Sequence, residues 1–89
     1  MSVRVVDADG APELSMAEFA ELLVSLEQDL TRARPEAVVL ADDSDASLAA
    51  ALAASKLLIP LEAAPAAIDA PSDNGRVIAQ LASAYTPRA

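Results

Sequence analysis

One stretch decides the fold: residues 37–45 read Ala37-Val38-Val39-Leu40-Ala41-Asp42-Asp43-Ser44-Asp45. The first five residues form a continuous apolar run without alternation, which is typical of a strand buried on both faces of a parallel sheet. Three carboxylates and a serine follow, and an alanine-rich helix is expected from about Ala46 to Leu57. A buried strand that leads through a polar turn into a helix is the repeating step of an α/β domain.

The chain before this stretch predicts one strand and one helix. Val3–Val6 is a short β-branched run, and it ends at a loop of residues 7–12 that is rich in Asp, Gly and Pro. Ser15 and Glu18 have the spacing of a capping box, in which each side chain bonds the other residue's free backbone N–H. The helix that they begin ends before Pro35, and apolar residues recur along it at helical spacing: Phe19, Leu22, Leu23, Leu26 and Leu30.

The chain after this stretch predicts a third strand and a last helix. Residues 58–61 form the strand, with Pro60 near its start or at an edge because proline lacks a donor. Residues 63–70 are expected to form a loop. Ser72 or Asp73 caps the last helix, whose apolar side consists of Val77, Ile78, Leu81 and Tyr85.

The order β-α-β-α-β-α predicts the architecture. We expect one α/β domain over residues 1–89, with a three-stranded parallel sheet, flanking helices and right-handed crossovers. The apolar fraction is 54%, but most of it is Ala, Val, Leu and Ile, and the aromatic residues are one Phe and one Tyr. Because small side chains remove little area from water, we expect a marginally stable monomer that gains stability by association.

Charge and composition exclude several classes of function. A net charge of -8, from six basic and fourteen acidic residues, disfavours nucleic acid and anionic membranes as partners. The absence of histidine and cysteine removes the commonest general base, thiolate nucleophiles and Cys-based metal sites. The chain shows neither a signal peptide nor an apolar run of transmembrane length, so a cytoplasmic location is expected.

The acidic turn of residues 42–45 is the leading candidate site. It follows the strand expected at the sheet centre, and open α/β sheets bind ligands at the carboxyl ends of their strands. Asp42, Asp43 and Asp45 could hold Mg²⁺ or Ca²⁺, which prefer oxygen ligands. The turn also has a structural interpretation, in which Asp or Ser44 caps the following helix and stabilises the positive end of its dipole.

Other charged residues are weaker candidates. Asp7 and Asp9 could join the acidic turn if the first strand neighbours the second, although Asp and Gly are ordinary residues in turns. Arg76 could bind an anion at the start of the last helix, or it could pair with Asp73 or Glu62 at the surface. A phosphoacceptor site of the receiver type would need a lysine after a later strand, whereas Lys56 lies in the alanine-rich helix.

Four motifs of the chain occur in the same order in one protein family. They are Pro35-Glu36-Ala37-Val38-Val39-Leu40, Asp42-Asp43-Ser44-Asp45, Leu48 to Ala54, and Ile59-Pro60. They resemble a strand, a polar turn, an alanine-rich helix and an Ile-Pro strand of the non-hydrolysing UDP-N-acetylglucosamine 2-epimerases. The resemblance runs from about Glu27 to Ser83, and Ser15 to Glu18 also suit the start of a family helix. It implies one truncated slice of the N-terminal half of a glycosyltransferase-B-like fold.

The departures from the family concern its chemistry. After the Ile-Pro strand the family carries a His-Val-Glu-Ala-Gly-Leu-Arg-type motif with an active-site Glu. In register, Ala63 stands at the His position, Pro65 at the Glu position and Asp69 at the Arg position. The family's Pro-Glu-Glu-x-Asn-Arg motif reads Pro71 to Arg76, where Asp73 and Arg76 keep its charges and Asn74 is displaced by one.

The family's turn aspartate is retained as Asp43, although its glycine neighbour is replaced by Asp42. Proton abstraction from a sugar needs a positioned base, which alanine and proline do not provide. The resemblance therefore implies a chain that is not an enzyme and carries no cofactor.

Three hypotheses for the function follow. The first is a non-catalytic interaction or scaffold domain that forms a homodimer or docks onto a larger protein, because so small a parallel sheet leaves two open edges. The second is a small-ligand module with residual UDP-sugar or metal binding, through Asp43, Ser44, Asp73 and Arg76 or through the acidic turn. The third is an enzyme that uses only carboxylates, which needs two acids converging in a pocket.

Overall fold

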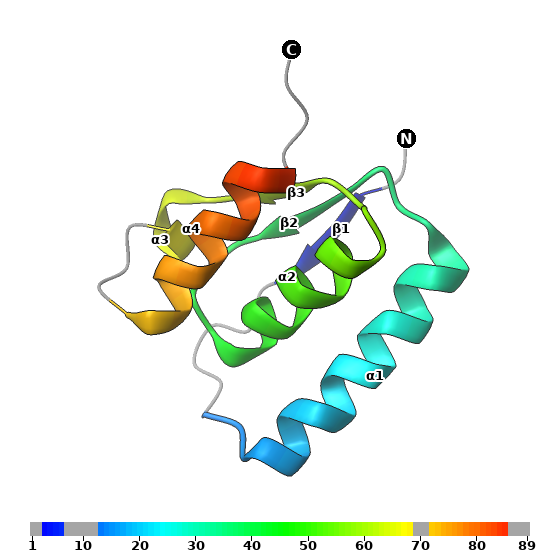
Figure 1. The fold of residues 1–89 in the computed structure, drawn as a ribbon, viewed down its shortest axis with the longest axis horizontal. Helices are drawn as coiled ribbons and strands as arrows, with labels where there is room; N and C mark the ends of the chain where they lie inside the picture. The colour runs from blue at the N-terminus through cyan, green and yellow to red at the C-terminus, as the bar shows by residue number, and fades with distance from the viewer. Residues whose placement is uncertain (1–2, 7–12, 69–71, 86–89) are drawn as a thin grey trace.

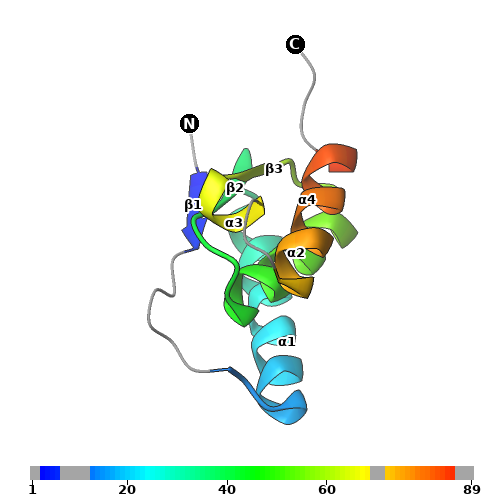
Figure 2. The ribbon, with the colours of Figure 1, turned by 90° about the vertical axis from the view of Figure 1, so that its left-hand side faces the viewer.

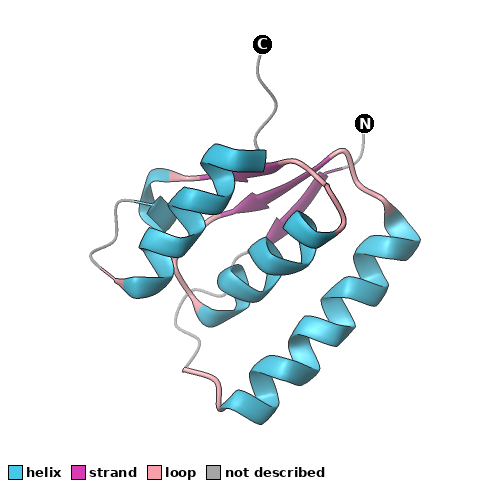
Figure 3. Cartoon of the chain, in the orientation of Figure 1, coloured by secondary structure: helices cyan, strands magenta, loops and turns pink. Residues whose placement is uncertain are grey.

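Three short strands lie in chain order in one parallel sheet. The computed structural model describes residues 3–6, 13–68 and 72–85. The strands are β1 (Val3–Val6), β2 (Ala37–Leu40) and β3 (Leu61–Ala63), and their order in the sheet is β1-β2-β3 (Figures 1 and 3). Val5 pairs with Val39, and Val39 pairs with Glu62. The predicted fold class, an α/β unit with a three-stranded parallel sheet, is confirmed.

Helices alternate with these strands. They are α1 (Met16–Ala33), α2 (Asp45–Lys56), α3 (Pro65–Ile68) and α4 (Asp73–Tyr85). The capping box of α1 is present: the Glu18 N–H donates to Ser15 Oγ at 3.1 Å, and the Ser15 N–H donates to Glu18 Oε1 at 2.9 Å. Helix α1 ends before Pro35, as predicted. Its carboxyl end is capped by Arg34, which adopts a left-handed backbone conformation.

The helices cover one face of the sheet. Right-handed crossovers between neighbouring parallel strands place α1 and α2 on the same side, and Figure 2 shows both helices and α4 on one side of the strands. Side chains that point to this side are completely buried: Val38, Leu40 and Leu61. Leu26 and Leu30 of α1 and Ile78 of α4 complete this core.

The opposite side of the sheet is not covered by any helix of the described residues. We call this surface, formed by Val5, Ala37, Val39 and Glu62, the open sheet face. Val5 is 60% exposed, Ala37 and Val39 are half-buried, and Glu62 is exposed. The prediction that residues 37–41 are buried on both faces is therefore wrong, because both crossovers run on the same side.

Helix α2 lies close to the sheet because its inner surface is made of small residues. Its buried alanines are Ala49, Ala50, Ala51, Ala53 and Ala54. The helix contacts all three strands and lies between α1 and α4 (Figure 1). Leu52 and Lys56 are exposed on the outer side of this helix, whereas Leu48 is half-buried and packs against the core.

The third strand begins later than its sequence predicts. The Ile59 N–H donates to the Ala54 carbonyl at 2.9 Å, and the Leu58 N–H donates to the Ser55 carbonyl at 3.2 Å. These two bonds form a Schellman motif, in which Leu58 has the left-handed φ of 60° that glycine usually supplies. Leu58 and Ile59 therefore end α2 and do not begin the strand. The Val38 N–H donates to the Pro60 carbonyl at 2.9 Å, and Leu61–Ala63 is the segment in register with β2.

The expected loop of residues 63–70 contains a short helix. Ala63 belongs to β3, and Pro65 occupies the first position of α3, where its missing N–H would have no helical partner. The Ile68 and Ala67 N–H groups both donate to the Ala64 carbonyl. Residues 69–71 and the side chain of Tyr85 lie outside the described part of the chain.

Candidate functional site

The candidate site lies at the carboxyl end of the sheet, where β2 runs into α2. The ladder continues past the strand ends, since the Ala41 N–H donates to the Val6 carbonyl at 3.0 Å and the Ala64 N–H donates to the Leu40 carbonyl at 2.9 Å. The turn of residues 42–44 is thus fixed to both neighbouring strands. Its polar side chains are held at this edge.

Asp42 fixes the shape of the turn. Its Oδ1 accepts hydrogen bonds from the Ser44 N–H at 3.0 Å and from Ser47 Oγ at 2.8 Å. Ser47 is completely buried, so the carboxylate supplies an acceptor where water is excluded. Asp42 acts as a structural group here and does not line the pocket described below.

Ser44 caps the amino end of α2. Its Oγ accepts a hydrogen bond from the Ser47 N–H at 3.1 Å, and its backbone carbonyl accepts one from the Leu48 N–H at 3.0 Å. At the start of α4 the same function falls to Ser72, whose Oγ accepts from the Gly75 N–H at 3.0 Å. Of the two caps considered for the last helix, Ser72 and Asp73, the structure therefore selects Ser72.

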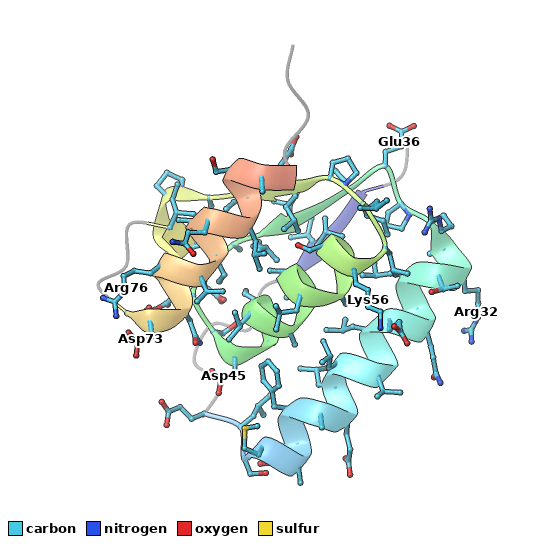
Figure 4. All side chains as sticks on the ribbon, in the orientation of Figure 1. Arg32, Glu36, Asp45, Lys56, Asp73 and Arg76 are labelled. Atoms are coloured by element: carbon cyan, nitrogen blue, oxygen red, sulfur yellow. The ribbon has the colours of Figure 1, made fainter. Side chains whose placement is uncertain are left out.

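Asp43 and Asp45 join three segments that are distant in sequence. Ser72 Oγ donates to Asp43 Oδ2 at 2.7 Å, and Asn74 Nδ2 donates to Asp45 Oδ1 at 2.8 Å and to the Asp43 carbonyl at 3.1 Å. The Leu14 N–H donates to Asp45 Oδ2 at 2.9 Å. The acidic turn is thus tied to the start of α4 and to the segment that precedes α1 (Figure 4).

These bonds alter the acidity of two carboxyl groups. The side-chain amide of Asn74, followed by the Leu14 N–H, holds the pKa of Asp45 below its ordinary value of 3.8. The Ser15 N–H, followed by the Ser15 hydroxyl, lowers the pKa of Glu18 below 4.5. Both carboxylates are therefore stabilised in their ionised form by the fold.

A polar pocket opens between these segments. Its volume is about 380 Å³, and it is lined by Glu13, Asp43, Ser44, Asp45, Ser72, Asp73 and Asn74. Four of the predicted site residues meet here: Asp43, Ser44, Asp45 and Asp73. Glu13, Ser72 and Asn74 were not predicted as site residues, and Asn74 had been noted only as a displaced motif position.

Arg76 does not line this pocket. It forms an exposed ion pair with Asp73 one helical turn away. With four carboxylates at its walls, the pocket disfavours anions such as a phosphate group unless a cation intervenes. Asp7 and Asp9, the other predicted contributors, lie outside the described residues.

The predicted metal ligands point to different partners. The carboxylate of Asp42 accepts from Ser47, that of Asp43 from Ser72 and that of Asp45 from Asn74. Among the described residues, no group of three or more His, Cys, Asp or Glu side chains is placed to hold a metal ion. The three carboxylates are therefore engaged in separate hydrogen bonds of the fold.

Two of the positions that the sequence analysis set against the epimerase motif lie at the same edge of the sheet. Ala63 ends β3, and Pro65 begins α3. Neither side chain carries a group that transfers protons. Asp69 lies outside the described part.

The fold and the residues at the carboxyl edge of the sheet together define a class of protein. It is a small α/β domain with a three-stranded parallel sheet and an acidic, hydrogen-bonded pocket at the carboxyl end of that sheet. No protein-family model matches the chain, and neither a curated protein nor a solved structure shows a significant similarity to it. Within the described ranges, none of the helices has the length and apolar character needed to cross a membrane.

Proposed function

We propose that this chain is a non-catalytic interaction domain, which associates with a second copy of itself or docks onto a larger protein. One observation carries the proposal: both broad faces of a thin slab expose apolar side chains. The domain measures 33 × 27 × 18 Å. Val5 is 60% exposed on the open sheet face, and Val24 is 54% exposed on the helical face.

Parallel sheets are normally covered on both faces, so an uncovered face favours a partner. The residues at the candidate site support the same proposal. The carboxylates of the acidic turn accept hydrogen bonds that join the chain's own segments. Burial and bonding of this kind favour a scaffold over a reaction centre.

A degenerate fragment of a UDP-N-acetylglucosamine 2-epimerase is the origin that we propose for this domain. The β-α-β-α-β order and Asp43 support this relation, and Ala63 and Pro65 explain why catalysis would be lost. An acidic domain without a catalytic set fits a scaffold within the cytoplasm.

Sedimentation equilibrium tests self-association. Over micromolar concentrations we expect the mass to rise from the 9.1 kDa of one chain toward twice that value. Added salt should favour the larger species, because it screens the repulsion between two chains of net charge -8. A mass of 9.1 kDa at every concentration and salt level would contradict self-association and leave a different protein as the partner.

A second candidate function is binding of a nucleotide sugar or a metal ion, which the pocket of about 380 Å³ favours. The hydroxyl groups of Ser44 and Ser72 and the amide of Asn74 offer hydrogen bonds to a sugar. Because the four carboxylates would repel the diphosphate of a nucleotide sugar, binding would need Mg²⁺ between the carboxylates and the diphosphate.

An amide NMR titration with UDP-N-acetylglucosamine tests this second function. We expect saturable shifts at residues 43–45 and 72–76 only when Mg²⁺ is present, because the cation neutralises the acidic wall. Titrations with Mg²⁺ alone and with N-acetylglucosamine alone separate the contributions of metal and sugar. Resonances that stay unmoved in all three titrations would rule out this function.

A further inference from the structure

An apolar groove runs between α1 and α2 on the helical face of the domain. The two helices lie side by side (Figures 1 and 3) and leave a groove of about 410 Å³. Four apolar residues and two charged residues line it: Leu23, Val24, Leu52, Ala53, Glu27 and Lys56. We call this surface the α1–α2 groove.

The groove exposes branched apolar side chains that its own helices do not cover. Val24 is 54% exposed and Leu52 is 37% exposed, whereas Leu23, which also lines the groove, packs against the buried core. Covering Val24 and Leu52 would remove apolar area from water, which stabilises a complex by about 25 cal/mol per Å². Binding of a partner with an apolar surface of its own is therefore favourable here.

The charges of the groove are self-complementary. Lys56 Nζ lies 3.8 Å from Glu27 Oε2, and both side chains remain accessible to solvent. Figure 4 shows Lys56 on the side of α2 that faces α1. In a two-fold dimer each patch meets its own inverted copy. The Lys56 side chain of one copy can then face the Glu27 side chain of the other, so opposite charges meet across the interface.

The open sheet face lacks this property. Its charged residue among the described side chains is Glu62. Two copies packed through this face would bring acidic groups together. A chain of net charge -8 therefore pairs with itself more favourably through a surface that carries a positively charged residue, as the groove does with Lys56.

The helical face is also large enough. Viewed down the shortest axis, the domain extends over 33 × 27 Å. A standard interface buries about 800 Å² per partner, which would take up most of a face of these dimensions, including the groove.

We propose, on the basis of the interaction function above, that a second copy of this chain binds in the α1–α2 groove to form a two-fold dimer. The apolar residues of each groove, Leu23, Val24, Leu52 and Ala53, pack against the groove of the other copy. Glu27 and Lys56 form the rim of the interface, and the open sheet face stays outside it.

Two lysine substitutions of similar exposure test the assignment. Val24→Lys places an ammonium group in the groove, and we expect the dimer dissociation constant to rise roughly 100-fold because the interface would bury unpaired charges. Val5→Lys, on the open sheet face, is the matched control and should leave the constant within about twofold of wild type. Circular dichroism checks that both variants are folded.

A charge exchange gives an independent readout. Lys56→Glu should weaken the dimer about tenfold because two acidic groups then meet at each rim, and adding Glu27→Lys should restore it. The exposed pair contributes little to the fold of one chain, so the restoration reports on the interface.

Three outcomes overturn the assignment. If Val5→Lys dissociates the dimer and Val24→Lys does not, the open sheet face is the interface. If neither variant changes a dimeric wild type, the groove is wrong while the interaction function stands. A wild type that remains a single chain at all concentrations refutes the dimer itself, before any variant is compared.

Discussion

Leu40→Ala is expected to lower the free energy of unfolding by about 2–5 kcal/mol. Leu40 is completely buried at the end of β2, under α2 and beside β3. The helix that packs on β2, α2, buries mainly alanines, which cannot extend into the space that the leucine would leave. Since small domains are stable by about 5–15 kcal/mol, this loss is a large fraction of the total. Urea unfolding followed by circular dichroism, at one fixed protein concentration, measures it.

Two neighbouring valines of β2 supply the matched comparison. Val38 is completely buried toward the helices, whereas Val39 is half-buried on the open sheet face. We expect Val38→Ala to cost about 2 kcal/mol and Val39→Ala less than about 1 kcal/mol, because only the first leaves a cavity. Equal costs would contradict a core that lies on one side of the sheet.

The elements of this fold could be predicted because their signals are local. The apolar run of residues 37–41 predicts a strand, and the spacing of Leu26 and Leu30 predicts the buried side of a helix. The capping box at Ser15 and the cap at Ser44 depend on residues within one helical turn. For such features, the residue types and their spacing determine the hydrogen bonds.

The errors have identifiable physical reasons. Leu58 adopts a left-handed conformation that sequence analysis expects of glycine, so the Schellman motif that ends α2 was interpreted as the start of a strand. A one-turn helix at Pro65 is too short for any periodic signal. The apolar run of β2 suggested burial on both faces, but the hand of the crossovers leaves one face without a helix.

The connections at the candidate site are long-range, which explains why they were missed. Leu14 lies 31 residues before Asp45, and Asn74 lies 29 residues after it. The position of the acidic turn at the strand end could be predicted from the topology of α/β sheets. The partners of Asp43 and Asp45 depend on where α4 and the segment before α1 lie relative to α2, which no local pattern specifies.

Asp45→Ala is the second substitution for which we expect a large effect, a loss of about 1–3 kcal/mol at pH 7. It removes a carboxylate that accepts from Leu14 and Asn74 and that lies at the positive end of α2. Because folding lowers the pKa of Asp45, its contribution is complete above the ordinary value of 3.8 and is lost as the pH falls through the lower pKa of the folded state. The difference in the free energy of unfolding between wild type and Asp45→Ala should therefore be smaller at about pH 3 than at pH 7, and urea unfolding at both pH values would show this.

Asp73→Ala is the control that separates a bridging carboxylate from an ordinary acidic residue in a first helical turn. Asp73 opens α4 as Asp45 opens α2, but it is exposed and pairs with Arg76 at the surface. Such pairs contribute about 0–1 kcal/mol, so this variant should remain close to wild type. The lowered pKa of Glu18 affects wild type and both variants alike, and it cancels in the comparison. If both variants lost the same stability, or if the Asp45→Ala gap were unchanged at low pH, the carboxylate would not be what holds the three segments together. The acidic turn would then be free to serve a ligand, and the pocket would become the stronger basis for the function of this domain.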